Sequence, residues 1–347
     1  MNRKANPTPP ASVAILGADG AGLGAARALA KDSLSSTLFE VDPTHCGLRS
    51  RWATPQPLKA WSGPALLEDL QAWRDSLSSD ANPVLIPTRT DSALTLIEAL
   101  PNLAERFTYK VGDLERAKAF LHPDGFRDQI RSLLGKDAAA AQLLPADGSP
   151  MGPDSQSYVC VLYLTPQDQL PLSFVARRLR RWPVGTGPTS AALPAEAEDA
   201  RALKALTQSL FQKTGMVGWL SLSFQKRPKD GAFLMEAATV GLLPLEAELA
   251  ALNGCPLVRY GVAEQTGRPL PKATAPFKGL DLTGTGGQRS WRVDLATDLK
   301  ALADPKAEPP SLHGVAMVDG IWRWSDPLPG LCAHGKRLVG RKKSKKV

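Results

Sequence analysis

The sequence has few of the residues from which many catalytic and metal centres are built. Among 347 residues there are only four histidines, which are scattered, and four cysteines with no Cys-x-x-Cys pair. The cysteines are Cys46, Cys160, Cys255 and Cys332. This pattern predicts buried free thiols rather than a disulfide framework or a zinc site. It offers no support for a zinc enzyme or a serine hydrolase.

Long apolar runs are also missing. No segment approaches the roughly 18 consecutive apolar residues of a membrane-spanning helix. The first ten residues are polar and proline-rich, unlike a signal peptide. We therefore expect a cytoplasmic protein with no membrane partner. The contents of 43% hydrophobic and 22% charged residues are those of a globular protein.

Positive charge is concentrated at the C-terminal end. Residues 336–347 hold seven lysines and arginines and no acidic residue, out of a net charge of +8. Such a block is typical of a disordered, solvated tail, and it could also bind acidic surfaces or nucleic acid through counterion release. Because no aromatic residues are interleaved for base stacking, we expect no specific nucleic-acid recognition.

The first third of the chain alternates between predicted strands and helices. Ser12 to Gly17 is a short apolar run, and a glycine-rich turn then leads into a helical stretch, which is the opening of a βαβ unit. Strands are predicted at 37–41 and 83–87, and helices at 25–31, 64–76 and 91–100, the last with Asp91 as N-cap. The alternation predicts a doubly wound, parallel-sheet domain over residues 1–113.

The glycine-rich turn admits two interpretations. Glycines at a helix N-terminus expose N–H groups to an anion, and Asp42 lies near the spacing of a ribose-binding acid. The candidate nucleotide ligands are Gly17, Gly20, Gly22 and Gly24. The dinucleotide fingerprint is matched only in part, because Asp19 stands where a fingerprint begun at Gly17 needs glycine. The other interpretation is a structural strand-to-helix turn.

The second half of the chain is predicted to be largely antiparallel. Ser221 to Val240 has a Pro-Lys-Asp-Gly turn in which Gly231 can adopt positive φ, so it predicts a hairpin whose second strand ends at Glu236. The other predicted elements are a hairpin of 158–164 with 172–181, helices at 114–120, 126–134, 195–214 and 245–252, and a strand running into a helix over 289–302.

This hairpin resembles the metal-binding hairpin of the ATP-grasp superfamily. There, one strand offers a glutamate and the next ends in Glu-x-Asn followed by an arginine, and the oxygens hold Mg²⁺ ions that bridge ATP phosphates. Here Ser223 replaces the first glutamate, Glu236 is retained, Ala238 replaces the asparagine and Val240 the arginine. Further stretches fall in the order seen in the ATP-grasp carboxylate–amine ligases: Val13–Gly17, Gly22–Leu29, Leu48–Trp52, Val84–Asp91, Phe174–Pro183 and Asp326–Pro329.

The resemblance implies an α/β protein in which the doubly wound N-terminal domain is followed by a shortened ATP-grasp-like α+β region. We expect a reduced middle lobe over 114–157, a C-terminal lobe over 158–335 and the basic disordered tail over 336–347. Between Lys118 and Tyr158 only about 40 residues are available, and the family's Lys-Pro strand, whose lysine contacts ATP phosphate, is missing there.

The resemblance also assigns roles to charged residues. Arg178 and Arg180 are the predicted catalytic residues, since on a strand they share one face while Arg177 and Arg181 share the other. A guanidinium group suits phosphate or acylphosphate oxygens, although such arginines are also found on exposed strand edges.

Glu236 is the predicted metal ligand, with a strand-end glutamate paired to an arginine or lysine as the alternative. Lys118 is the predicted ATP contact, with a solvated helix face as the alternative. ATP and Mg²⁺ are the cofactors that the family implies.

We predict a degenerate ATP-grasp-like protein, a pseudoenzyme that serves as a non-catalytic binding or partner subunit and has a protein partner. One alternative is an active ATP-dependent ligase, which would phosphorylate a small-molecule carboxylate and let an amine attack the acylphosphate. A nucleotide-dependent oxidoreductase that uses the glycine turn is a second alternative.

Overall fold

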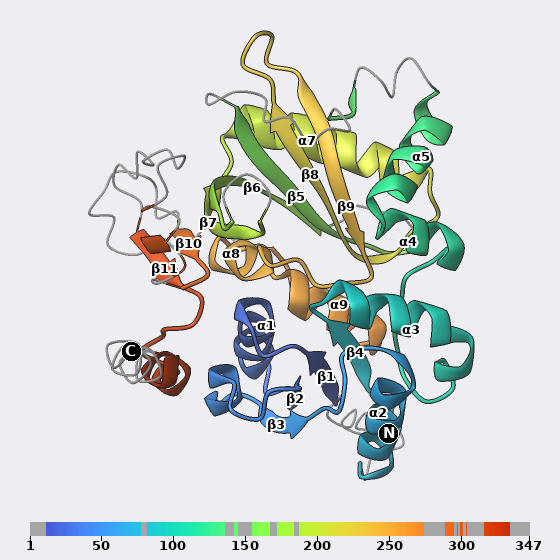
Figure 1. Cartoon of the computed structure of the whole chain (residues 1–347), viewed down its shortest axis with the longest axis vertical. Helices are drawn as coiled ribbons and strands as arrows, with labels where there is room; N and C mark the ends of the chain where they lie inside the picture. Colours follow the sequence, from blue (N-terminus) through green and yellow to red (C-terminus); the bar gives the residue numbers. More distant parts are fainter. Residues whose placement is uncertain are drawn as a thin grey trace, which may run out of the picture.

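A computed structural model gives the fold of the chain (Figure 1). It describes residues 12–77, 82–135, 142–144, 155–166, 172–183, 187–273, 289–294, 297, 299–300, 303 and 316–333. The predicted basic tail lies outside these residues, and so do parts of the segment 289–302. In the described part of the chain no helix is long and apolar enough to cross a membrane.

The N-terminal part folds into a four-stranded sheet. Its elements are β1 (Val13–Leu16), α1 (Gly20–Ala30), β2 (Ser36–Glu40), β3 (Thr54–Pro57), α2 (Gly63–Asp75), β4 (Val84–Pro87) and α3 (Thr90–Leu103). The strand order is β3-β2-β1-β4, and every pairing is parallel. The apolar runs of β1 and β4 are completely buried, as parallel strands covered by helices require. The predicted doubly wound parallel sheet is confirmed.

Two details of this sheet differ from the prediction. Strand β3 was not expected, because its sequence Thr-Pro-Gln-Pro is largely exposed and carries no β-branched alternation. Helix α3 begins at Thr90, so Asp91 is not the N-cap but lies in the first turn. There its Oδ1 accepts a hydrogen bond from the Ser92 N–H at 2.9 Å, where a carboxylate also interacts favourably with the helix dipole.

The rest of the chain builds a seven-stranded sheet and its covering helices. The elements are α4 (Leu114–Phe120), α5 (Pro123–Leu134), β5 (Gln156–Leu164), β6 (Leu172–Arg181), β7 (Thr189–Pro194), α7 (Ala197–Gln212), β8 (Gly218–Lys226), β9 (Phe233–Val240), α8 (Ala247–Leu252), α9 (Leu257–Gln265), β10 (Arg289–Arg292) and β11 (Ala316–Asp319). The order is β11-β10-β7-β6-β5-β8-β9. β10 and β11 pair in parallel, and the other neighbours are antiparallel.

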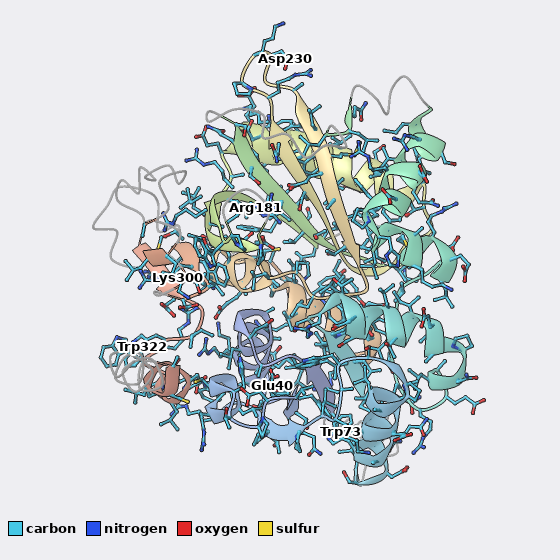
Figure 2. All side chains as sticks on the ribbon, in the orientation of Figure 1. Glu40, Trp73, Arg181, Asp230, Lys300 and Trp322 are labelled. Atoms are coloured by element: carbon cyan, nitrogen blue, oxygen red, sulfur yellow. The ribbon has the colours of Figure 1, made fainter. Side chains whose placement is uncertain are left out.

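Both predicted hairpins, β5–β6 and β8–β9, are confirmed. In the turn of the second, Gly231 has a φ of 70°, and the Arg227 N–H donates to the carbonyl of Ala232. Figure 2 shows Asp230 at the tip of this hairpin. Strand β9 does not end at Glu236 as predicted, because the following residues up to Val240 continue to pair with β8.

The seven-stranded sheet has two covered faces, between which side chains alternate along β5. Tyr158 and Cys160 belong to a core cluster with residues of α4, α5 and α7, and we call this the outer face. Val159 and Val161 belong to a second cluster with residues of α1, α8 and α9, and we call this the inner face. Figure 1 shows α8 and α9 between the two sheets. The inner face therefore looks toward the N-terminal sheet.

The described part of the predicted middle lobe packs on the edge strand β9. Phe120 of α4 and Phe126 of α5 are buried in the outer-face core, and Leu143 bridges to Met235 of β9. Within the described residues of 114–157, the only strand is the start of β5, which belongs to the seven-stranded sheet. The domain boundaries at 113 and 157 remain predictions.

Candidate functional site

The β8–β9 hairpin contains a β-bulge at the retained glutamate. Ser223 pairs with Ala237 and Phe224 pairs with Met235, so Glu236 is an extra residue on β9. A bulge of this kind sets two residues against one and shifts the side-chain alternation that follows it. The bulge therefore decides which later residues can share a face with Glu236.

Glu236 and Ala238 lie on opposite faces as a result. In a regular strand, residues two positions apart share a face, which is what the Glu-x-Asn pattern requires. Ala238 instead packs in the outer-face core, opposite Leu222. Glu236 meets Arg178, which follows the inner-face residue Ala176 by two positions. Position 238 is thus turned away from the retained carboxylate.

Four charged side chains meet above the inner face, and we call them the Glu236 cluster: Arg178, Arg181, Glu236 and Glu246. Arg181 Nη1 donates to Glu236 Oε1 at 2.5 Å. Arg178 Nη1 lies 3.9 Å from Glu236 Oε2, while Arg178 Nε donates to Glu246 Oε1 at 3.3 Å. The Thr189 hydroxyl also donates to Glu246. The four side chains are between 4 and 17% exposed, and their formal charges cancel.

The predicted alternation of the arginines on β6 is wrong. Arg178 and Arg180 were expected on one face, with Arg177 and Arg181 on the other. The pairing of β6 with β7 is irregular between Arg178 and Arg180 and again between Arg180 and Arg181. These irregularities bring Arg181 to the same carboxylate as Arg178, whereas Arg177 lies 3.9 Å from Glu196. Arg180 is buried.

The oxygen donors of the Glu236 cluster do not fit Mg²⁺. This ion needs near-octahedral oxygen coordination, usually with carboxylates that are free to bind it. Both carboxylates here contact guanidinium groups, and Ser223 contributes only a hydroxyl to the hairpin. No group of three or more His, Cys, Asp or Glu in the described part of the chain could hold a metal ion. Arginine already supplies the positive charge beside Glu236.

The glycine-rich turn lies at the start of α1 and is capped by the chain itself. Asp19 Oδ1 accepts from the N–H groups of Ala21 and Gly22, at 3.0 and 3.1 Å. A Cβ at Gly22 would lie 1.8 Å from the carbonyl oxygen of Gly17, so close packing alone requires glycine there. Burial raises the pKa of Asp19, and the two N–H groups oppose this shift. This geometry favours the structural-turn interpretation.

The other candidate cofactor residues stand apart from the Glu236 cluster. Lys118 lies on α4, where its ammonium group contacts Glu115 one turn earlier. A Cβ added at Gly20 would meet Val293, Trp291 and Leu245, and one at Gly24 would lie 2.8 Å from Glu248 of α8. Of the predicted site residues, the structure therefore brings together Arg178 and Glu236. Their roles, and those of Arg180, Lys118 and the four glycines, remain predictions.

Sequence reasoning missed Glu246 and Thr189. Glu246 is buried within the apolar stretch Leu242–Ala247, and a buried carboxylate requires a charged or hydrogen-bonding partner. That lone acid in an apolar segment was a readable signal. The sequence gave no such signal for Thr189, since threonine is a common residue in β-strands.

All four cysteines are free thiols, as predicted. Cys160 and Cys255 are buried, which raises the pKa of each to about 12, whereas Cys46 and Cys332 are partly exposed. The expectation that all four are buried is therefore wrong for Cys46 and Cys332.

Comparison with known proteins finds similarity only in three dimensions. No family model matches the sequence. No curated protein matches it either. The complete multifunctional pyruvate carboxylase from Rhizobium etli has a TM-score of 0.57 at 10% identity, over 78% of this chain. This chain covers only 29% of that one.

Two single biotin carboxylase units are matched over most of their length. The biotin carboxylase from Campylobacter jejuni, in a β-γ-ATP complex, has a TM-score of 0.55 at 11% identity, over 76% of this chain and 72% of that one. The biotin carboxylase domain of the Hydrogenobacter thermophilus 2-oxoglutarate carboxylase, in complex with MgADP and bicarbonate, has a TM-score of 0.55 at 9% identity, over 77% and 72%. Over about three quarters of its length the chain therefore has a fold like that of biotin carboxylase domains, which confirms the predicted fold class.

Proposed function

We propose that this chain is a non-catalytic ATP-grasp-like protein that acts by binding a partner. The observation that carries the proposal is the β-bulge, which leaves Glu236 on the inner face and turns position 238 into the outer-face core. A two-ligand site built on Glu-x-Asn needs both positions on one face. Restoring asparagine at 238 would therefore not restore the site.

The charges around Glu236 support the same proposal. A cation that approached this carboxylate would have to displace Arg181 Nη1, which is bonded at 2.5 Å, and would face two guanidinium groups. Each lost charged contact to metal or phosphate costs about 1.5–3 kcal/mol, so two such losses weaken binding about 100-fold or more. Mg·ATP should therefore bind weakly or not at all.

The partner role has support from an exposed apolar surface. Trp324, Leu328 and Leu331 are 88, 54 and 53% exposed, and they lie just before the basic segment 336–347 in the sequence. Figure 2 places Trp322, whose ring contacts that of Trp324, at the periphery of the molecule. Apolar side chains followed by seven positive charges suit a partner with an apolar, acidic surface. The neighbours include domains of multi-domain carboxylases, in which such a fold works beside others.

The test is a calorimetric titration of the full chain with ATP, with and without Mg²⁺. We expect no saturable heat that depends on Mg²⁺ and no release of ADP in the presence of candidate carboxylates. Micromolar, Mg²⁺-dependent affinity would contradict the proposal. The matched variant Ser223→Glu adds a carboxylate on the hairpin. It should also give no Mg²⁺-dependent heat with ATP, because Arg181 is still bonded to Glu236.

A second candidate function is the active ATP-dependent ligase. Arg178 Nη1 and Glu236 Oε2 are buried without a hydrogen-bond partner among the described atoms, so a ligand that entered the Glu236 cluster would find an unsatisfied donor and acceptor. Turnover of ATP to ADP that is lost in Arg178→Gln would favour this alternative over the non-catalytic one.

A further inference from the structure

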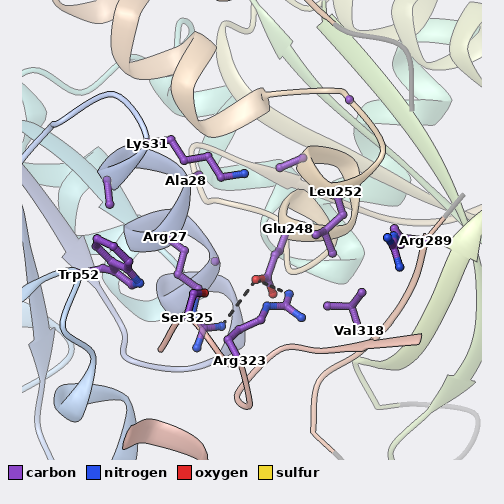
Figure 3. Close-up of a pocket in the computed structure, with 14 residues that line it drawn as sticks. Arg27, Ala28, Lys31, Trp52, Glu248, Leu252, Arg289, Val318, Arg323 and Ser325 are labelled. Atoms are coloured by element: carbon purple, nitrogen blue, oxygen red, sulfur yellow. Dashed lines mark hydrogen bonds and ion pairs between the residues drawn. The ribbon is translucent and has the colours of Figure 1, made fainter. Parts of the chain in front are cut away.

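A cavity of about 700 Å³ lies between α1, α8 and the segment around β11 (Figure 3). The described residues that line it share no member with the Glu236 cluster. They include four cationic side chains, Arg27, Lys31, Arg289 and Arg323, with the single carboxylate of Glu248. Their formal charges sum to +3, and Asp326, which is bonded to Arg27 outside the lining, offsets one of these charges. The remaining positive charge favours an anionic ligand, because like charges around a common cavity repel one another.

Two of these cations are fixed in place by the chain. Arg27 donates to the carbonyl oxygens of Gly320 and Ile321, at 2.5 and 3.0 Å, and to Asp326 at 3.2 Å. Arg323 donates to Glu248 Oε1 at 2.7 Å. Burial lowers the pKa of Arg27, and although Glu248 raises it, the Arg323 guanidinium lowers it further. The cations therefore crowd one another in geometry that is set before any ligand arrives.

Glu248 is itself held by a third donor. Its Oε2 accepts from the indole N–H of Trp291 at 2.8 Å, and Arg27 Nη1 lies 3.6 Å from Oε1. The carboxylate is therefore committed to orienting Arg27 and Arg323. Together with Asp326, it offsets the charges of these two arginines, and the other cationic side chains of the lining are Lys31 and Arg289.

Lys31 adds an exposed cation to the lining. Its side chain is exposed, and within the described residues it forms no ion pair or hydrogen bond. Figure 3 shows it extending from α1 toward the other lining residues. Apolar surface comes from Ala28, Leu252 and Val318, and Trp52 lies at one side. Fixed charges, an adaptable lysine and apolar walls are the components of a small-molecule site.

We propose that this cavity binds a small organic polyanion, whose phosphate or carboxylate groups meet Lys31, Arg289 and Arg323 while its carbon body contacts Leu252 and Val318. The volume falls within the roughly 300–1,000 Å³ of small-molecule pockets. Arginine matches phosphate and carboxylate equally well, so both sources of the charge are tested.

The experiment titrates the full chain by calorimetry with pyrophosphate and, in a second arm, with citrate. Sodium chloride at matched ionic strength is the control for screening. We expect saturable binding of at least one probe, and the stronger arm identifies the preferred anionic group. Lys31→Gln should weaken it about tenfold or more, the effect of losing one charge-assisted contact.

Two further variants separate the cavity from general electrostatic attraction. Lys229→Gln removes the same charge from the exposed β8–β9 turn and should keep wild-type affinity. Ser325→Trp fills the cavity from an exposed position without a change of charge and should abolish binding. Equal losses in Lys31→Gln and Lys229→Gln, full affinity in Ser325→Trp, or no saturable binding at about millimolar probe would each overturn the proposal.

The result is independent of the proposed lack of ligase activity. ATP that binds in this cavity would do so without Mg²⁺ and would be displaced by the stronger probe. ATP that binds at the Glu236 cluster would need Mg²⁺ and would not respond to Lys31→Gln.

Discussion

The Glu236 cluster differs from a second buried group, the Arg27 cluster of Arg27, Glu248, Arg323 and Asp326. The first joins strands of one sheet to the residue before α8, and it leaves Arg178 Nη1 and Glu236 Oε2 without hydrogen bonds among the described atoms. The second joins α1, α8 and the segment after β11, across as many as 299 positions of sequence.

The two clusters also differ in how completely they are hydrogen-bonded. Asp326 is fully buried and accepts from the Ser50 hydroxyl, the Arg51 N–H and Arg27 Nε, at 2.7, 3.1 and 3.2 Å. Buried ion pairs stabilise a fold only when additional hydrogen bonds offset their desolvation. The Arg27 cluster meets this condition, so we assign it the greater part in stability. The Glu236 cluster meets it less well, because two of its polar atoms lack hydrogen bonds among the described atoms.

The largest expected effect is that of Asp326→Ala. The substitution removes the carboxylate that accepts hydrogen bonds from the Arg27 guanidinium, the Ser50 hydroxyl and the Arg51 N–H. The free energy of unfolding should therefore fall by about 3–5 kcal/mol. Urea unfolding followed by circular dichroism measures it. Asp230→Ala, which removes an exposed carboxylate from the hairpin tip, is the control and should leave the midpoint unchanged. A loss no larger than the control's would show that the Arg27 cluster does not hold the segments together.

An intermediate effect is expected for Glu236→Gln. It removes the charge that faces Arg181 and Arg178, and the free energy of unfolding should fall by about 1–3 kcal/mol. The double variant Glu236→Leu with Arg181→Met should recover most of that loss, because apolar side chains often replace a buried ion pair without cost. If Glu236→Gln lowered the free energy of unfolding by more than Asp326→Ala does, the Glu236 cluster would be the one that contributes more to stability.

The smallest effect concerns an ion pair outside both clusters. Partial burial raises the pKa of Asp199, but the hydrogen bonds from Lys226 and Tyr158, at 2.7 and 2.6 Å, outweigh it and lower the pKa below 3.8. A lowered folded-state pKa gives stability above the unfolded value, which is lost as pH falls through the folded one. Asp199→Asn should therefore cost about 0.5 kcal/mol at pH 7, and its stability should converge with that of wild type as the pH falls below 3.8 and through the folded-state pKa.

The parts of this fold that depend on local sequence were predictable. The strands β1 and β4 are continuous apolar runs, and the turn at Gly231 has the residue types that such turns require, so neighbouring residues were enough to predict them. Strands β7 and β11 were missed, because these short segments show no clear alternation of apolar and polar residues.

The site was harder to predict than the fold. Arg181 and Glu236 are 55 positions apart, and their contact depends on irregular pairing that leaves no trace in residue type. Arg27 was a partial signal, since a charge among the buried alanines of α1 must find a partner. Nothing in the sequence named Asp326 as that partner, although both belong to stretches that carry the family resemblance.

The bulge at Glu236 separates two kinds of change that a lineage can undergo. A substitution alters which atoms a position carries, whereas a gained or lost residue also reverses the face to which the later positions of the strand point. With one residue too many in β9, substitution at position 238 places any new side chain in the outer-face core. An arrangement with Glu236 and residue 238 on one face would thus require removal of a residue from the strand, because substitution at position 238 alone leaves the two side chains on opposite faces.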